Sequence, residues 1–182
     1  MKKRMFLGLV LAAVCFAGIG GAEARELQSL DGTWQIVFDP NNEGRERRWV
    51  RSEHFPEAQA RDITVPGCWE LVEKDYEGVA FYRRTFRVPA SWKGKIVRLQ
   101  FDAVNFRAEV WLNDVAVGVH EGGFTPFEFR IDGLLRFDAE NTLILRVVGP
   151  ILLHDKHVDG MGPMETCLLY TSPSPRDLST SR

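Results

Sequence analysis

The chain has 182 residues, 26% of them charged, and a formal net charge of −2. A weakly acidic chain without a basic stripe lacks the electrostatic footprint of a nucleic-acid-binding protein. Of the three cysteines, only Cys68 lies outside the two ends of the chain, so no disulfide is expected within the central part. We expect Cys68 to be a small buried side chain.

A secretory leader is predicted over residues 1–24. Three basic residues at positions 2–4 precede an uncharged apolar run from Met5 to Ile19, and residues 22–24 read Ala-Glu-Ala, the form of a cleavage site. The run is short for a bilayer span, which needs about 20 residues. We therefore expect export to a periplasmic or extracellular location and no membrane association after the leader is removed.

Short segments with alternating apolar residues follow. Turn residues separate them about every ten residues, and no long helical pattern is present. This spacing is typical of an all-β sandwich. Strands are predicted over Thr33–Phe38, Ile63–Val65, Ala80–Val88, Lys95–Phe101, Ala108–Asn113, Val115–Val119, Thr125–Ile131 and Thr142–Val148.

The clearest hairpin lies in the middle of the chain. Ala108, Val110 and Leu112 alternate with residues that must point to the opposite face of the sheet. Asn113-Asp114 then forms a two-residue turn, since Asn and Asp tolerate positive φ. The next strand begins directly after this turn.

Several motifs occur in a fixed order along the chain. The run from Phe101 to Leu135 contains VNF, VWLND and GGFTPFEF. Upstream are Leu30–Trp34 (LDGTW), Val65–Trp69 (VPGCW) and Gly78–Phe86 (GVAFYRRTF), and downstream is Asn141–Val148 (NTLILRVV). Together these motifs resemble the N-terminal sugar-binding domain of glycoside hydrolase family 2, which includes β-galactosidases, β-glucuronidases and β-mannosidases.

The resemblance covers about Leu27 to Thr166 and implies a domain organisation. Residues 25–150 would form a jelly-roll sandwich of the galactose-binding type, and residues 151–166 an exit loop toward a missing domain. In this family the catalytic carboxylates lie in a downstream (β/α)₈ barrel, where two Glu residues perform retaining hydrolysis. No catalytic residue is therefore assigned within the chain, and we expect the chain alone to be inactive.

The implied parent is an exported hydrolase of β-linked sugars, most like a β-galactosidase, in which this domain shapes the rim of the active site. Its partners would be a carbohydrate, namely a β-glycoside, and the downstream domains of the same polypeptide. One alternative is a free-standing carbohydrate-binding or adhesion module. Another is a jelly roll with no sugar affinity of its own.

Four residues are candidates for contact with a sugar within the sandwich. In family 2 β-galactosidases the Asn of a matching segment reaches toward the sugar, and the resemblance gives that role to Asn105, for which the alternative is a turn-forming side chain. His120 and Glu121 are expected in a glycine-rich loop, where they could bond a sugar or simply be solvated. Trp69 is expected in a loop as a stacking platform or an interdomain contact.

The exit loop carries the remaining candidate, Asp155. In family 2 β-galactosidases an Asp after the last strand helps to bind substrate and a monovalent cation, and Asp155 and Asp159 are the nearby carboxylates. The pattern H-D-x-H-x-D at residues 154–159 suits a metal by composition, but its spacing is not a standard zinc pattern. No metal ligand is therefore assigned and no cofactor is expected in this chain; a monovalent or divalent cation would belong to the parent enzyme.

The end of the chain has a different character. Cys167 to Asp177 reads CLLYTSPSPRD, which resembles the translation of a sequencing adapter. The alternative is a Ser/Pro linker to a further domain. In either case the composition of residues 167–182 predicts disorder.

Overall fold

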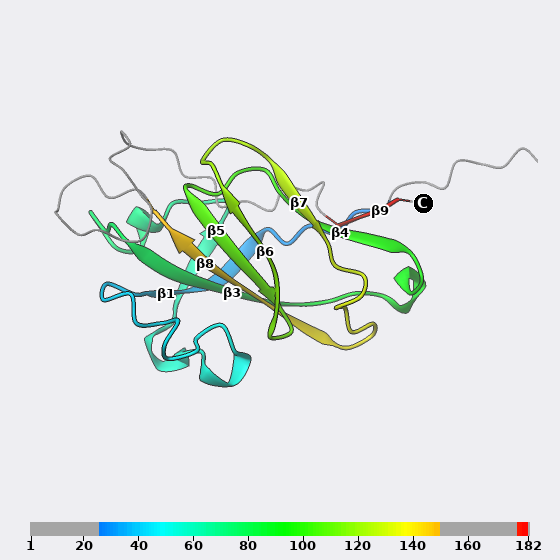
Figure 1. The fold of residues 1–182 in the computed structure, drawn as a ribbon, viewed down its shortest axis with the longest axis horizontal. Coiled ribbons are helices and arrows are strands. Elements are labelled where there is room, and N and C mark those ends of the chain that lie inside the picture. The colour runs from blue at the N-terminus through cyan, green and yellow to red at the C-terminus, as the bar shows by residue number, and fades with distance from the viewer. Residues whose placement is uncertain (1–25, 150–177, 182) are drawn as a thin grey trace, which may run out of the picture.

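The fold is a sandwich of two antiparallel sheets. The computed structural model describes residues 26–149 and 178–181. Within these, one sheet has six strands in the order β2-β1-β3-β8-β5-β6, and the other has three in the order β7-β4-β9 (Figure 1). The strands are β1 Gly32–Phe38, β2 Arg61–Val65, β3 Val79–Arg87, β4 Ile96–Phe101, β5 Arg107–Leu112, β6 Val115–Glu121, β7 Phe127–Arg130, β8 Glu140–Val148 and β9 Leu178–Ser181.

This architecture confirms the predicted all-β jelly-roll sandwich. Each of the eight predicted strands is present, and the predicted turn joins β5 to β6, with Asn113 at φ 51° and Asp114 at φ 68°. The Asn113 side chain accepts a hydrogen bond from the Thr142 backbone N–H at 3.0 Å and donates one to the Leu134 carbonyl at 2.8 Å. The turn is thus fixed to β8 as well as by its own backbone preference.

Strand β9 was not predicted. We expected disorder over residues 167–182, and this is wrong for Leu178–Ser181, which pair antiparallel with β4. The physical reason is that β7 occupies only one side of β4, so the other edge presents unpaired backbone groups to any extended segment. The exit loop 151–166, with Asp155, lies outside the described residues, as does the predicted leader.

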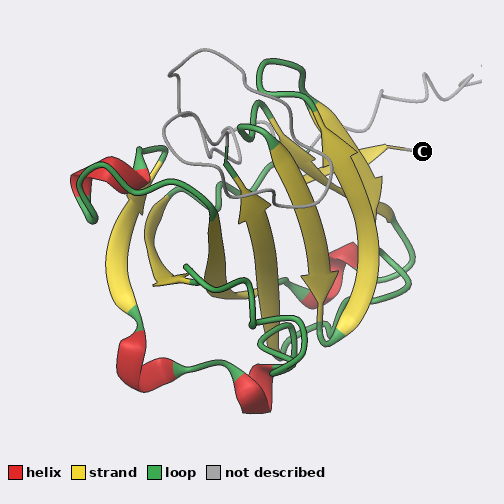
Figure 2. Ribbon diagram, turned by 60° about the vertical axis from the view of Figure 1, so that its left-hand side comes forward, coloured by secondary structure: helices red, strands yellow, loops and turns green. Residues whose placement is uncertain are grey.

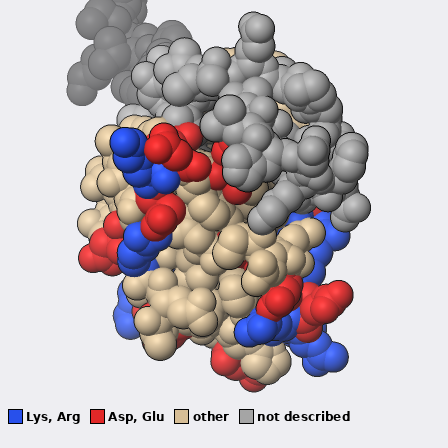
Figure 3. Space-filling model, turned by 90° about the vertical axis from the view of Figure 1, so that its left-hand side faces the viewer, with Lys and Arg blue, Asp and Glu red and all other residues tan. Residues whose placement is uncertain are grey.

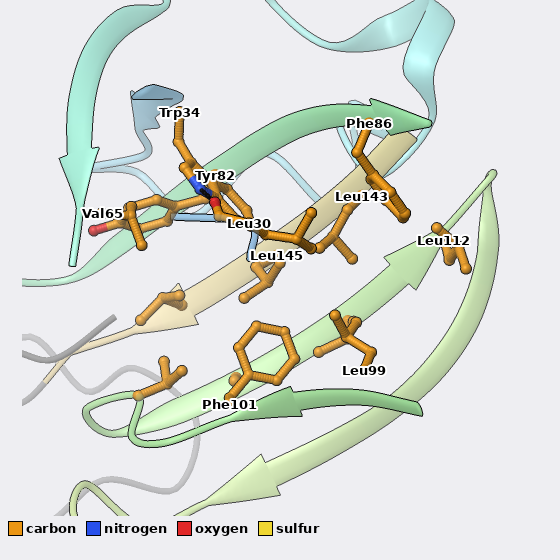
Figure 4. Packing of buried hydrophobic residues seen from close by; sticks show 14 of the residues in the cluster. Leu30, Trp34, Val65, Tyr82, Phe86, Leu99, Phe101, Leu112, Leu143 and Leu145 are labelled. Carbon is orange, nitrogen blue, oxygen red and sulfur yellow. Dashed lines mark hydrogen bonds between the residues drawn. The ribbon is translucent and has the colours of Figure 1, made fainter. Parts of the chain in front are cut away.

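The main core fills the space between the sheets. Figure 4 shows Trp34, Tyr82 and Leu145 of the six-stranded sheet facing Leu99 and Phe101 of β4, and none of the five is more than 3% exposed. Burial of each large apolar side chain contributes about 1.5–3 kcal/mol. A small apolar cavity remains between the sheets, lined by Trp34, Val65, Tyr82, Phe101, Val104, Leu145 and Val147.

A second apolar cluster covers the outer face of the six-stranded sheet. The connection from residue 39 to residue 60 folds back over β3 and β8 and packs Trp49 and Phe55 against Phe81 and Ile144. The rings of Trp49 and Phe81 meet edge to face at 5.4 Å. Since Val79–Tyr82 of β3 and Leu143–Leu145 of β8 are buried on both faces, these stretches are continuously apolar rather than alternating, while the rest of each strand also carries polar side chains.

Helical structure in the described part is limited to short 3₁₀ turns at the periphery of the sandwich (Figure 2). No helix among the described residues has the length and apolar character needed to cross a membrane. The turns are η1 Ser52–His54, η2 Glu57–Gln59, η3 Trp69–Leu71 and η4 Ala90–Trp92.

Candidate functional site

Two loops meet at one end of the sandwich. The β4–β5 loop, residues 102–106, lies against the β6–β7 loop, residues 122–126, because the strands that bracket them pair Arg107 with Glu121. The Gly122 backbone N–H donates to the Phe106 carbonyl at 2.9 Å. This junction brings Asn105, His120 and Glu121 to the same end of the fold.

Asn105 sits at the centre of the junction. Its side chain is half-buried, and its amide oxygen lies where Gly123 leaves room, since a Cβ at Gly123 would come within 2.6 Å of that oxygen. Within residues 26–149 the Asn105 side-chain amide has no hydrogen-bond partner. A neutral amide in this position can both donate to and accept from sugar hydroxyls without the cost of desolvating a charge.

His120 and Glu121 lie at the end of β6 and not in a loop, so that part of the prediction is wrong. Strand β6 extends through Glu121 because both residues continue the antiparallel pairing with β5. The His120 ring stacks on Phe127 at 4.1 Å, and its Nε2 lies 3.0 Å from Thr125 Oγ1. His120 thus holds the start of the β6–β7 loop against β7.

Glu121 is exposed and forms an ion pair with Arg107 at 3.1 Å. Arg107 also places its Nε 3.1 Å from the carboxylate of Glu109. The exposed carboxylate at the junction is therefore connected, through one guanidinium, to a buried carboxylate on the outer face of the sheet.

Trp69 does not form a stacking platform. It lies in η3 and is only 3% exposed, because its ring packs edge to face on Phe38 at 6.4 Å and on Tyr76 at 5.7 Å, with Gly149 close to its edge. The burial of Trp69 excludes the predicted stacking platform, while the alternative of an interdomain contact stays a prediction. The Gly before it in the sequence marks a turn, but the turn directs the indole into the core.

Burial also affects Tyr76, which shares this aromatic cluster. Its hydroxyl donates to the Val79 carbonyl at 2.6 Å. Desolvation of the phenol raises the pKa of Tyr76 to about 12. Tyr76 therefore stays neutral at ordinary pH, where it packs in this cluster and does not act as an acid.

Sequence reasoning missed a buried charge cluster on the outer face of the six-stranded sheet. Glu109 is 1% exposed and pairs with Arg45 and Arg146, in addition to Arg107. Arg146 is 3% exposed, and its second guanidinium nitrogen donates to Asn42 Oδ1 at 2.6 Å. Burial lowers the pKa of Arg146, and the nearby Glu109 acts in the opposite direction.

Strand alternation alone would place Glu109 on the solvent-facing side of β5, opposite Ala108 and Val110, but the structure buries it. The connection of residues 39–60 covers this face of the sheet, and a solvent-facing position in the strand pattern becomes an interior one. Glu109 and Arg146 stand directly opposite each other on β5 and β8. Their opposite charges could have indicated an ion pair. Such a prediction would have required knowing that β5 pairs with β8, which the local sequence pattern does not show.

The chain leaves the described part at the same end of the sandwich. The Phe106 N–H donates to the Val148 carbonyl at 3.1 Å, and the Gly149 N–H donates to the Gly78 carbonyl at 2.8 Å. Uncharged residues occupy the middle of the visible surface here, with acidic and basic side chains toward its margins (Figure 3). Phe124, in the β6–β7 loop, is 66% exposed.

Metal binding finds no support in the described part of the chain. No group of three or more His, Cys, Asp or Glu residues in residues 26–149 could hold a metal ion. Cys68 is half-buried, and its Sγ lies beside the Glu70 carboxylate. Asp155 and the H-D-x-H-x-D pattern lie outside the described residues, so the role predicted for Asp155 stays a prediction.

Comparison with known proteins identifies this architecture. Residues 72–161 match the family model described as "Glycosyl hydrolases family 2, sugar binding domain". The chain belongs to this family. The matched region includes both loops of the junction and strands β3 to β8, so the family's sugar-binding domain and the candidate site coincide in the sequence.

Relatives of known activity agree with this assignment. A β-glucuronidase of Paenibacillus borealis is 34% identical over 128 residues, 68% of this chain and 21% of the relative. A β-galactosidase of Priestia megaterium is 31% identical over 145 residues, 66% of this chain and 14% of the relative. A solved β-glucuronidase of Ruminococcus gnavus, in complex with a C6-substituted uronic isofagomine, superposes with a TM-score of 0.66 at 29% identity, over 71% of this chain and 22% of that structure. The chain thus spans between 14% and 22% of the length of these relatives.

Proposed function

We propose that this chain is the non-catalytic sugar-binding domain of an exported glycoside hydrolase that acts on a β-linked sugar. In this proposal the β4–β5 and β6–β7 loops form part of the rim of an active site whose catalytic carboxylates lie in a later domain of the same polypeptide. The predicted leader supports export. We propose no cofactor for the domain itself, and a cation, if one is used, would bind in the parent enzyme.

The position of Asn105 is the observation that carries the proposal. Its amide is half-buried against Gly123, has no hydrogen-bond partner among residues 26–149, and lies at the end where the chain leaves the described part of the sandwich. A polar group that is held in place and has no partner within this part of the chain is suited to bind a ligand. A following domain would begin beside it, so that a sugar could contact both.

For the substrate, we propose a β-glucuronide first and a β-galactoside second. The solved structure reported above is a β-glucuronidase, while the relatives include both activities. The described residues do not distinguish the two sugars, because the Asn105 amide is neutral and the Arg107 and Glu121 side chains are paired with each other. Sugar selectivity would therefore reside in the later domain.

A binding experiment on the chain itself tests the proposal. D-Glucuronic acid, D-galactose and D-mannose are titrated separately into the isotopically labelled chain, and amide resonances are followed by NMR. One neutral hydrogen bond contributes only about 1 kcal/mol, so affinity of about millimolar or weaker is expected. Shifts should centre on Asn105 and residues 122–124 and disappear in Asn105→Ala, while the exposed Asn41→Ala serves as the matched control.

The same preparation is assayed with p-nitrophenyl β-D-glycosides. We expect no hydrolysis, since retaining glycosidases need two carboxyl groups about 5 Å apart across the sugar. Hydrolysis by the purified chain would contradict a non-catalytic role. Sugar-induced shifts confined to a surface remote from the two loops, or affinity of about micromolar, would instead favour a free-standing carbohydrate-binding module.

A further inference from the structure

Phe124 is the most exposed aromatic side chain of the described residues. It is 66% exposed, whereas every other Phe, Tyr and Trp side chain between residues 26 and 149 is buried or half-buried. A single exposed apolar side chain is common on protein surfaces and does not indicate a site by itself. Phe124 is distinguished by its position in the β6–β7 loop, beside the amide of Asn105.

The backbone on both sides of Phe124 is tied to neighbouring segments. Before it, the Gly122 N–H donates to the Phe106 carbonyl at 2.9 Å. After it, Thr125 Oγ1 lies 3.0 Å from Nε2 of His120. These contacts limit the loop motion that a ligand on the Phe124 ring would have to restrict, which lowers the entropic cost of binding there.

Asn105 lies next to this loop but deeper in the surface. A Cβ at Gly123 would come within 2.6 Å of the Asn105 amide oxygen, and Gly123 directly precedes Phe124. Consecutive Cα atoms are only about 3.8 Å apart. Asn105 is half-buried, whereas Phe124 is mostly exposed. The junction thus places an amide without a partner among residues 26–149 beside an aromatic ring that extends farther out.

An amide and an exposed aromatic ring together suit a glycoside. The hydroxyl groups of a sugar exchange hydrogen bonds with an amide. An aromatic ring attracts a flat apolar surface, such as another aromatic ring or the C–H face of a pyranose. A β-glycoside consists of a sugar and an aglycone, the group joined to the sugar through the glycosidic oxygen. When the sugar contacts the deeper Asn105, the aglycone lies on the outer side, where Phe124 is.

We propose that Phe124 is a stacking platform for the aglycone of the β-glycoside whose sugar contacts Asn105. The inference rests on the proposed function and adds a substrate class, namely β-glycosides whose aglycone is a ring with a flat apolar face. That ring is either aromatic or a second pyranose. Phe124 thereby takes the stacking role that the sequence pattern suggested for Trp69, whose ring is buried. The platform selects among aglycones and not among sugars.

NMR titration of the isotopically labelled 182-residue chain tests the proposal. The probes are the methyl and phenyl β-D-glucuronides, the methyl and phenyl β-D-galactosides, and lactose, in which the aglycone of a β-galactoside is a pyranose. Within each series the sugar is constant and only the aglycone changes. Each probe is titrated to tens of millimolar, since affinities of about millimolar or weaker are expected.

Three variants isolate the ring. Phe124→Ala removes the platform, and Phe124→Tyr keeps an aromatic face. Leu27→Ala is the matched control, because Leu27 is also an exposed apolar side chain, at 46%. It lies at the opposite end of the sandwich, where the neighbouring Gln28 donates to the carbonyl of Arg87 at the end of β3.

Phenyl glycosides should bind about two- to tenfold more tightly than methyl glycosides, the range expected for one aromatic pair. Phe124→Ala should abolish this preference and leave the affinity for methyl glycosides unchanged, while Phe124→Tyr and Leu27→Ala should retain the preference. Lactose that binds more tightly than methyl β-D-galactoside, in a manner lost in Phe124→Ala, would show that the platform also accepts a pyranose. Equal affinities for these two would restrict it to aromatic aglycones.

Equal affinity for phenyl and methyl glycosides, or a phenyl preference that persists in Phe124→Ala, would overturn the proposal. Asn105→Ala judges the sugar contact separately, since it should weaken the binding of methyl and phenyl glycosides alike. Methyl glycosides that bind at Asn105 with no phenyl preference would leave the proposed function standing without the platform. A phenyl preference that depends on Phe124, with binding unaffected by Asn105→Ala, would keep the platform and contradict the sugar contact. Absence of shifts with every probe would overturn both.

Discussion

Replacement of Glu109 by Gln should destabilise the domain far more than the same replacement at an exposed ion pair. The Glu109 carboxylate is 1% exposed and compensates the guanidinium of Arg146, itself 3% exposed. Removal of one partner of a buried ion pair costs about 3–5 kcal/mol, because the other charge remains buried without compensation. Gln keeps one acceptor oxygen, so we expect about 3 kcal/mol for Glu109→Gln.

That cost is a large share of the roughly 5–15 kcal/mol by which domains of this size are stable. It corresponds to a fall in melting temperature of about 6–12 °C. The matched control is Glu128→Gln, which breaks the pair with Arg98 at 3.0 Å, where the side chains are 36% and 44% exposed. Such a surface pair contributes at most about 1 kcal/mol.

Urea unfolding followed by tryptophan fluorescence measures both variants, since Trp49 and Trp111 pack in or against the outer-face cluster. The reasoning is refuted if the two variants lose the same stability within about 0.5 kcal/mol, an interval set by the typical error of such differences. That result would mean that water reaches Glu109 or that the arginines relax into solvent.

Three further outcomes are expected. Gly123→Ala should displace Asn105, because the new Cβ meets the movable end of that side chain at 2.6 Å, and should cost less than about 1 kcal/mol of stability. NMR should show shifted Asn105 amide resonances with only a small fall in the urea midpoint, and an unmoved Asn105 would contradict this. The raised pKa of Tyr76, about 12 against 10 in the unfolded chain, stabilises the fold fully below pH 10, and this contribution of about 1–2 kcal/mol after screening is lost as pH rises to 12. Tyr76→Phe should remove that alkaline loss, so equal pH dependence of the two proteins would count against it. Trp69→Ala should cost about 3–5 kcal/mol through the cavity it leaves, and a loss of sugar affinity in a variant that keeps its stability would restore the platform prediction.

The strands and the central turn were accessible from the sequence because their determinants are local. Alternation at Ala108, Val110 and Leu112 assigns one face of β5, and Asn113-Asp114 requires the positive φ that only a few residues adopt readily. Tertiary context decided the rest. Strand β6 continues through His120 and Glu121 because β5 offers pairing partners there, although the following glycines predicted a loop.

The candidate site was accessible only in part for the same reason. The family resemblance indicated Asn105, and the structure shows what local pattern could not, namely that its side chain meets Gly123 from another loop. The burial of Trp69 and Glu109 could not be predicted, because each is covered by a segment distant in sequence. Burial of a single residue depends on such coverage, and period-two alternation reports only which residues share a face.

The central claim is that this chain is one domain of a longer glycoside hydrolase, and sequencing the source DNA from within the domain past codon 166 tests it most directly. The account predicts that the frame continues from Thr166 without the stretch Cys167–Asp177, into a second β-sandwich and a (β/α)₈ barrel with two active-site Glu codons. A frame that runs through Cys167–Asp177 to a stop codon after Arg182 would contradict it, and the chain would then stand as a free-standing sugar-binding module.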